Sequence, residues 1–316
     1  MTALARSQNQ CVGRQVASQA HLPLPTKQAT RASFVSAKSL RSALQKKLET
    51  ITFLNRLEYV YPPERLQSVV ARVNAVNFKQ LSAQWRLPLE LAYDLAPLAL
   101  YDVVIFADDS GSMAFEENGQ RISDLNMILG RVSEVATLFD DDGIQVRFMN
   151  SKVQGNGIRT AAAAAELVKQ VSFSGMMPLG GKLNANVIQP LLVKPIRQRK
   201  LEKPILVFAI TDGEPVGEPK VTTAQMIKSA KEIASKSAYG PGAIAFQFAQ
   251  VGRDQAAQAF LGELDNDPEI GGMIDATSYC EMEAEEWAQK GATLTPELWL
   301  LKCLVGAIDP SYDEQD

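Results

Sequence analysis

The chain has 316 residues, of which 46% are hydrophobic and 22% charged, and its formal net charge is −4 at pH 7. These fractions are typical of a globular protein, and they exclude a fibrous chain, a wholly disordered chain and a disulfide-dense miniprotein. No apolar run approaches the ~20 residues that a membrane-spanning helix needs. The sequence therefore predicts a protein without a membrane span.

Charge is unevenly distributed along the chain. Residues 1–48 contain eight Lys or Arg and no Asp or Glu, which leaves 24 basic and 36 acidic residues, a net charge of −12, in residues 49–316. Because the larger part is acidic, nucleic acid is not expected as a partner. An acid-free start that contains Ser and Arg is typical of a plastid or mitochondrial transit peptide, and a solvated disordered tail has the same composition.

Cysteine usage bears on the compartment. The cysteines are Cys11, Cys280 and Cys303, and no CxxC spacing occurs. This pattern is typical of a reducing compartment and does not indicate a zinc site. We expect an intracellular protein that is cytoplasmic or, if residues 1–48 act as a transit peptide, located in a plastid or mitochondrion.

Helices are the first elements expected. Apolar residues recur at helical spacing over residues 36–52, and residues 62–66, with two prolines and a glutamate, are typical of a helix N-terminus. Another short helix is expected at residues 87–92. The predicted organisation is a leader (residues 1–48), a helical flank (49–98), a main domain (99–308) and an acidic tail (309–316).

In the main domain, strands alternate with helices. The apolar runs that predict strands are residues 101–107, 144–149, 171–173, 204–211, 243–251 and 273–276. The periodic segments that predict helices begin with the alanine run at 161–165 and include residues 121–140, 183–193, 222–236, 254–264, 281–289 and 296–308. Strands too apolar to alternate indicate a parallel sheet that is covered on both faces. The predicted fold is therefore doubly wound α/β with a mostly parallel sheet.

Polar side chains follow two of these strands. Asp108, Ser110 and Ser112 form a D-x-S-x-S pattern directly after the first strand, and Asp212 follows the strand at residues 204–211. Because ligands bind beyond the carboxyl ends of parallel strands, we expect the four side chains to share one site. Their carboxylate and hydroxyl oxygens suit Mg²⁺, Mn²⁺ or Ca²⁺. On its own, the D-x-S-x-S pattern is a weak signal, because a turn that caps a helix has the same pattern more often.

In this combination, the two loops resemble those of a von Willebrand factor type A domain, over about residues 99–308. Residues 98–101, 108–113, 138–150 and 295–309 further resemble a group of intracellular proteins from fungi and other eukaryotes. The resemblance implies a metal-ion-dependent adhesion site in which Asp108, Ser110, Ser112 and Asp212 hold a divalent ion. It also implies that an Asp or Glu of a partner protein completes the coordination.

One position departs from the family pattern. Such domains present a threonine from a second loop, often as Thr-Pro-Leu-Gly, whereas the matching stretch here begins with Met177. A thioether is a soft ligand and a poor one for Mg²⁺ or Ca²⁺, so the ion is expected to bind weakly or not at all. The alternative to ion-dependent binding is a metal-independent scaffold whose ion site has degenerated at Met177.

Four more acids flank the predicted site: Asp109, Glu116, Glu117 and Glu214. Exposed acids are most often solvated, so these side chains are expected to form a rim around the site. Glu214 is the one expected closest to the ion, because it lies two residues beyond Asp212 in the same loop.

The sequence argues against an enzyme. The one histidine, His21, lies in the leader, so a Ser-His-Asp triad in the main domain is not expected. Neither a nucleophile elbow nor a phosphate-binding glycine loop follows the first strand. The predicted function is therefore non-enzymatic protein–protein interaction, in which a divalent ion at the site binds an acidic residue of the partner. The metal-independent scaffold is the alternative, and a metal-assisted hydrolase is less favoured.

Overall fold

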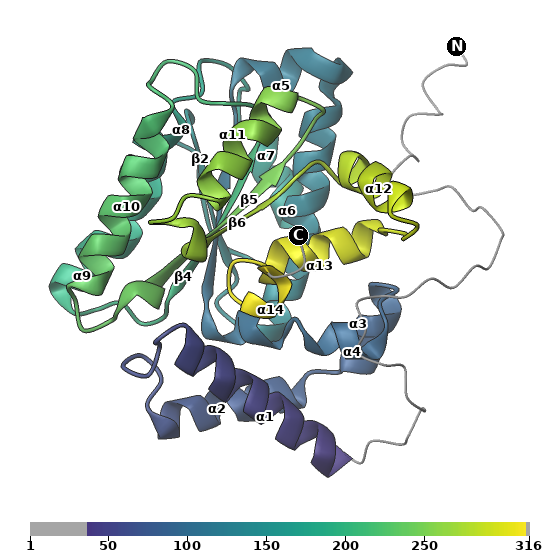
Figure 1. Cartoon of the computed structure of the whole chain (residues 1–316), viewed down its shortest axis with the longest axis vertical. Helices are drawn as coiled ribbons and strands as arrows, with labels where there is room; N and C mark the ends of the chain where they lie inside the picture. The colour runs from purple at the N-terminus through teal and green to yellow at the C-terminus, as the bar shows by residue number, and fades with distance from the viewer. Residues whose placement is uncertain (1–36, 314–316) are drawn as a thin grey trace.

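The computed structural model describes residues 37–313. A central β-sheet has helices on both faces, and a further group of helices lies at one end of the sheet (Figure 1). Most of the leader, including any transit peptide before residue 37, lies outside the described residues, as do the last three residues of the tail.

Within the described residues, six strands form one sheet in the order β3-β2-β1-β4-β5-β6. The strands are β1 (Asp102–Ala107), β2 (Ile144–Phe148), β3 (Gln154–Ile158), β4 (Ile205–Thr211), β5 (Ile244–Gln250) and β6 (Ile274–Thr277). All neighbouring strands run parallel except β2 and β3, which are antiparallel. The predicted doubly wound α/β fold with a mostly parallel sheet is confirmed.

The register of the two central strands positions the candidate site. Along β1 and β4 the pairing is unbroken, and it ends with Ala107 opposite Ile210. The amide of Asp108 continues this pairing by donating to the carbonyl of Ile210 at 2.9 Å. The loops that follow β1 and β4 therefore leave the sheet side by side at its carboxyl edge.

Amphipathic helices cover the sheet. Figure 1 shows α6 (Gln120–Phe139) and α13 (Pro296–Val305) on one face, and α8 (Leu179–Leu183), α9 (Lys194–Gln198) and α10 (Val221–Ser235) on the other. The remaining helices of the main domain are α5 (Gly111–Phe115), α7 (Ala161–Val168), α11 (Gln255–Asp265) and α12 (Cys280–Gln289), and α14 (Pro310–Asp313) lies in the predicted acidic tail. The 3-10 helical segments of this part are η2 (Glu116–Gly119), η4 (Pro241–Ala243) and η5 (Gly271–Met273), and η3 (Asn184–Val193) is a π-helical segment of 10 residues. No helix in residues 37–313 has both the length and the hydropathy needed to cross a membrane.

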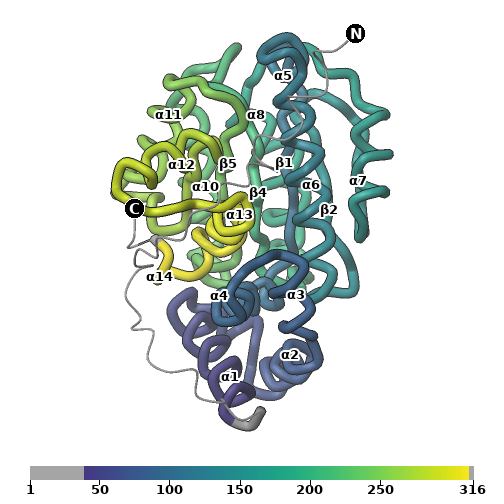
Figure 2. Tube along the Cα trace, turned by 90° about the vertical axis from the view of Figure 1, so that its right-hand side faces the viewer, coloured from purple at the N-terminus to yellow at the C-terminus, as the bar shows by residue number. Residues whose placement is uncertain are grey.

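The helical flank packs against the amino ends of the strands. It consists of α1 (Ala37–Leu54), α2 (Pro63–Ala75), α3 (Phe78–Gln84), α4 (Leu89–Tyr93) and η1 (Ala96–Leu100). Figure 2 shows α1 and α2 at the opposite end of the molecule from α5. Buried flank residues such as Leu48 and Leu57 belong to the same hydrophobic cluster as the sheet. The boundary predicted at residue 48 lies inside α1.

Polar contacts also join the flank to the C-terminal segment. Lys47 on α1 forms ion pairs with Asp94 and, at 3.0 Å, with Asp309. The hydroxyl of Tyr312 donates to Asp94 at 2.7 Å. The start of the predicted acidic tail is thus held against the flank, because the ammonium group of Lys47 pairs with a carboxylate from each of them.

One predicted strand differs from the structure. Residues 171–173 form a loop, and the edge strand is β3 (Gln154–Ile158), which pairs with β2. The sequence of β3, Gln-Gly-Asn-Gly-Ile, has two glycines and lacks the apolar or alternating pattern that predicts strands. β3 forms a strand because it pairs with the edge of β2 that β1 leaves free. The local sequence of β3 contains no sign of this pairing.

Asp124, on α6, provides a test of pH dependence. Its carboxylate accepts hydrogen bonds from Gln120 at 2.8 Å and Tyr279 at 3.2 Å, and burial raises its pKa from 3.8 to about 6. A raised folded-state pKa stabilises the fold at low pH, and this contribution is lost as the pH rises through about 6.

We therefore expect Asp124→Asn to flatten the dependence of the unfolding free energy on pH between 3.8 and about 6. Urea titrations of the natural protein and the variant at several pH values measure this difference. Parallel pH profiles for the two proteins would contradict the raised pKa.

Candidate functional site

The structure brings the four predicted site residues together at the carboxyl edge of the sheet. The hydroxyl oxygens of Ser110 and Ser112 lie 3.0 Å apart. Ser112 also donates a hydrogen bond to Oδ1 of Asp212 at 3.1 Å. Asp108, Ser110 and Asp212 are buried. The expectation that the loops after the two strands share one site therefore agrees with their positions.

Asp108 is bound by neighbours on both of its oxygens. Its Oδ1 accepts a hydrogen bond from the amide of Ser110 at 2.8 Å, and its Oδ2 accepts one from the hydroxyl of Thr211 at 3.0 Å. Burial, reinforced by the nearby Asp212 carboxylate, raises the pKa of Asp108 well above its ordinary range. An ionised Asp108 therefore destabilises the fold, because its charge is buried near a second carboxylate.

Arg121, on the first turn of α6, brings a positive charge into the site. Its side chain is only 4% exposed, and its Nη1 donates to Oδ2 of Asp212 at 2.7 Å. Its Nη2 lies 2.7 Å from Glu116 and 3.0 Å from Glu117. Burial disfavours the guanidinium charge, but these carboxylates keep the pKa of Arg121 above its ordinary value. Three carboxylates thus surround one buried cation.

The loop after β5 closes over this arginine. Gly252 adopts a positive φ of 79°, and a Cβ atom at this position would lie 2.4 Å from Nε of Arg121. The amide of Arg253 donates to Glu117 at 3.1 Å. A third strand end therefore contributes to the site and requires a glycine there, because a side chain would displace the guanidinium.

Sequence reasoning missed Arg121, although a signal was present. A cation in the first turn of a helix is disfavoured by the helix dipole, so an arginine there indicates a nearby carboxylate. The partner, Asp212, is 91 residues away in the chain. Only the folded arrangement identifies it.

The flanking acids take different roles. Asp109, expected in a solvated rim, is buried and accepts hydrogen bonds at 2.7 Å from the amides of Asn150 and Ser151. It ties the loop after β1 to the loop after β2. Glu214 forms an ion pair with the exposed Lys220, and its own side chain is 33% exposed.

Met177 occupies the second loop, where the family that the sequence resembles presents a threonine. Its side chain is buried, and its sulfur accepts a hydrogen bond from the hydroxyl of Thr211 at 3.0 Å. The same hydroxyl lies 3.0 Å from Asp108. The thioether of Met177 is therefore held in the site by packing and by one weak hydrogen bond from Thr211.

These contacts decide how well the residues fit a divalent ion. The oxygens of Asp108 and Asp212 accept hydrogen bonds from protein donors, and Met177 supplies a soft sulfur. A single positive charge already lies against Asp212. In the part of the chain that the structure describes, no three His, Cys, Asp or Glu side chains are grouped to hold a metal ion. The arrangement fits the guanidinium of Arg121 better than a divalent ion.

Comparison with known proteins adds no relative. No protein-family model and no curated protein matches the chain. What the site can do therefore follows from its own geometry: a buried cation and carboxylates at the carboxyl edge of the sheet, next to loops that reach the surface.

Proposed function

We propose that this protein is a non-enzymatic interaction domain of the von Willebrand factor type A kind whose binding edge works without a divalent ion. The observation that carries the proposal is the ion pair of buried Arg121 with Asp212 at 2.7 Å. A fixed guanidinium offsets the carboxylate charge at the position where the family resemblance implies an ion. Of the two kinds of interaction domain that the sequence predicts, this is the metal-independent one.

The contacts of the serines favour binding over hydrolysis. Ser110 and Ser112 contact each other, and Ser112 donates to Asp212. The other oxygen of Asp212 is held by Arg121. Because the Arg121 guanidinium occupies this carboxylate, Asp212 is not free to act as a general base for a hydroxyl. For this reason the proposal assigns the site no catalytic activity.

The expected compartment is also part of the proposal. Cys280 and Cys303 are both buried thiols. Buried, unoxidised cysteines agree with the reducing, intracellular location that the sequence predicts. Whether this is the cytoplasm, a plastid or a mitochondrion depends on the leader.

Calorimetric titration with Mg²⁺, Mn²⁺ and Ca²⁺ tests the proposed function. We expect no saturable heat from chelator-treated protein, and the same thermal midpoint in chelator as in excess Mg²⁺, because Arg121 already neutralises Asp212. The double variant Arg121→Gln/Met177→Thr removes the cation and supplies an oxygen ligand. It serves as the matched protein in which ion binding is expected to appear.

The variant Asp108→Asn distinguishes a metal-independent interaction domain from an ion-dependent one. We expect this variant to be at least as stable as the natural protein at neutral pH, because it removes a buried charge while its oxygen still accepts from the amide of Ser110. Saturable heat in the natural protein that disappears in Asp108→Asn would contradict the proposal. It would establish instead an ion-dependent site that recruits an acidic partner residue.

A further inference from the structure

Three large apolar side chains are exposed at the carboxyl edge of the sheet. Phe115 is 84% exposed, Met176 64% and Val216 54%. They belong to the end of α5, the loop before α8 and the loop after β4. Scattered apolar residues are normal on a protein surface, but a contiguous group around one site indicates a binding surface. We call these three residues the apolar edge.

Backbone contacts join the three segments that carry the apolar edge. The amide of Gly111, at the start of α5, donates to the carbonyl of Gly175 at 3.1 Å, directly before Met176. The amide of Val216 donates to the carbonyl of Met177 at 2.9 Å. Helix α5 and the two loops that carry the apolar side chains are thus hydrogen-bonded to one another, so the fold fixes their relative positions.

Acidic side chains lie beside the apolar edge. Glu116 and Glu117 directly follow Phe115, and their side chains are 56% and 31% exposed. Arg121, which pairs with both, is itself buried and also neutralises Asp212. The positive charge of Arg121 therefore lies inside the protein, while the carboxylates of Glu116 and Glu117 are partly exposed to solvent. One guanidinium offsets only one of the three negative charges that it contacts.

The exposed cations near the apolar edge do not outweigh the negative charge of Glu116 and Glu117. Lys220 forms an ion pair with Glu214. Arg253 lies between two further carboxylates, those of Glu281 and Glu285, each at 3.1 Å. Lys182, on α8, is a further cation near Asp109. With Lys182 included, the acidic side chains named here still outnumber the exposed basic ones.

We infer that the apolar edge and its acidic rim bind a protein segment in which a large apolar side chain is flanked by lysine or arginine. The apolar side chain would pack on Phe115 and Met176, and the cations would face Glu116 and Glu117. The exposed ring of Phe115 also offers a face to a guanidinium. An anionic lipid surface or a nucleic acid is disfavoured, because the rim repels phosphate.

This inference rests on the proposed function. A divalent ion held at Asp212 would add positive charge to the same edge and favour an acidic partner residue. With Arg121 as the internal cation, the exposed charge stays negative, and the complementary partner is basic.

A random peptide display library, selected against the immobilised full chain, tests the inference. We expect the enriched peptides to combine lysine or arginine with leucine, isoleucine, phenylalanine or methionine. Synthetic copies of these peptides should bind about 10-fold more weakly to Phe115→Ala, since loss of a central aromatic contact costs ~1–2 kcal/mol. Their affinity should also fall as salt is raised.

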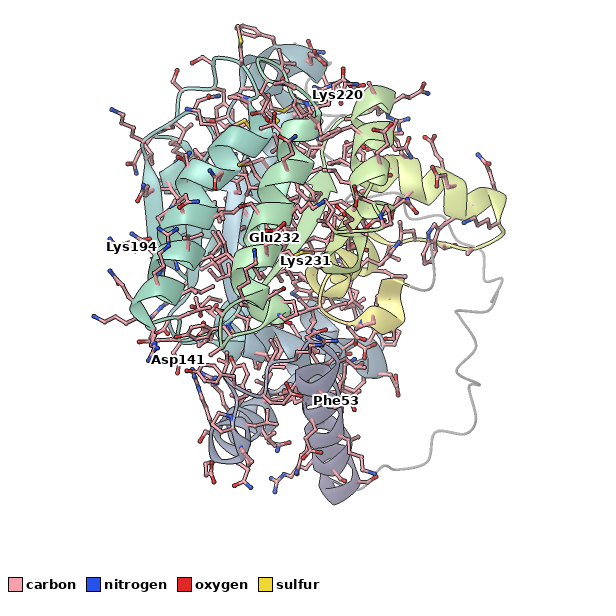
Figure 3. All side chains as sticks on the ribbon, turned by 60° about the vertical axis from the view of Figure 1, so that its left-hand side comes forward. Phe53, Asp141, Lys194, Lys220, Lys231 and Glu232 are labelled. Atoms are coloured by element: carbon pink, nitrogen blue, oxygen red, sulfur yellow. The ribbon has the colours of Figure 1, made fainter. Side chains whose placement is uncertain are left out.

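Phe53→Ala is the matched control. Phe53 is 71% exposed, but it lies on α1, at the opposite end of the molecule from Lys220, which marks the edge of the site (Figure 3). This substitution removes the same side chain from a distant surface, so it should leave peptide affinity unchanged. Because both phenylalanines are exposed, neither variant is expected to unfold.

Three outcomes would overturn the inference: enrichment of acidic peptides, equal losses of affinity in Phe115→Ala and Phe53→Ala, or no enrichment. Ion titration separates this failure from that of the proposed function. Saturable ion binding refutes the proposed function, whereas absent ion binding together with any of the three outcomes refutes the basic partner alone.

Discussion

Replacing Arg121 by methionine is expected to lower the free energy of unfolding by about 3–5 kcal/mol, because the substitution leaves a buried carboxylate without its cation. Asp212 is buried, and Nη1 of Arg121 lies 2.7 Å from it. Glu117 would lose its ion pair as well. Urea denaturation followed by circular dichroism measures the change.

The double variant Arg121→Met/Asp212→Asn is the control for this prediction. Removal of both buried charges should recover most of the lost stability, since a neutral amide needs no counter-charge. If Arg121→Met alone costs less than about 1 kcal/mol, the pair behaves as an exposed salt bridge, and the guanidinium is not the internal cation of the site.

Gly242→Ala is expected to destabilise the protein by about 1–3 kcal/mol by overpacking the contact between the flank and the main domain. A Cβ atom at Gly242 would lie 1.8 Å from the carbonyl oxygen of Asn55 and 3.0 Å from Leu57. Both neighbours belong to the segment that follows α1. The backbone of this segment or of η4 must therefore move, and a urea titration measures the cost.

Gly262→Ala is the matched control and should change stability in the opposite direction. Gly262 lies inside α11, and no atom lies within 4 Å of the position of its Cβ. Alanine in a helix interior is favoured over glycine by about 0.5–1 kcal/mol. If Gly242→Ala were also stabilising, the flank would not be packed against the main domain as the structure places it.

Much of the fold could be predicted from local pattern. β1 and β4 are unbroken apolar runs, and α6 shows apolar residues at helical spacing, so their type and approximate bounds follow from burial. β3 could not be predicted, because its glycine-rich sequence has no such pattern and forms a strand only by pairing with the open edge of β2.

The candidate site divides in the same way. Asp108, Ser110, Ser112 and Asp212 could be assigned to one place, because parallel strands end at a common edge. Thr211 and Arg121 could not. Thr211 is the last residue of an apolar strand, and its role depends on its distances to Asp108 and Met177.

The sequence by itself determined the doubly wound α/β fold, the position of the candidate site at two strand ends, and Met177 at the position where the family resemblance implies a threonine. These features depend on local periodicity and on residue type, which can be read without coordinates. Only the tertiary structure decided which charge lies in the site. Arg121 reaches Asp212 because the loop after β5, with Gly252 at its turn, covers the start of α6. Such a contact joins three segments far apart in the chain, so no local pattern contains it.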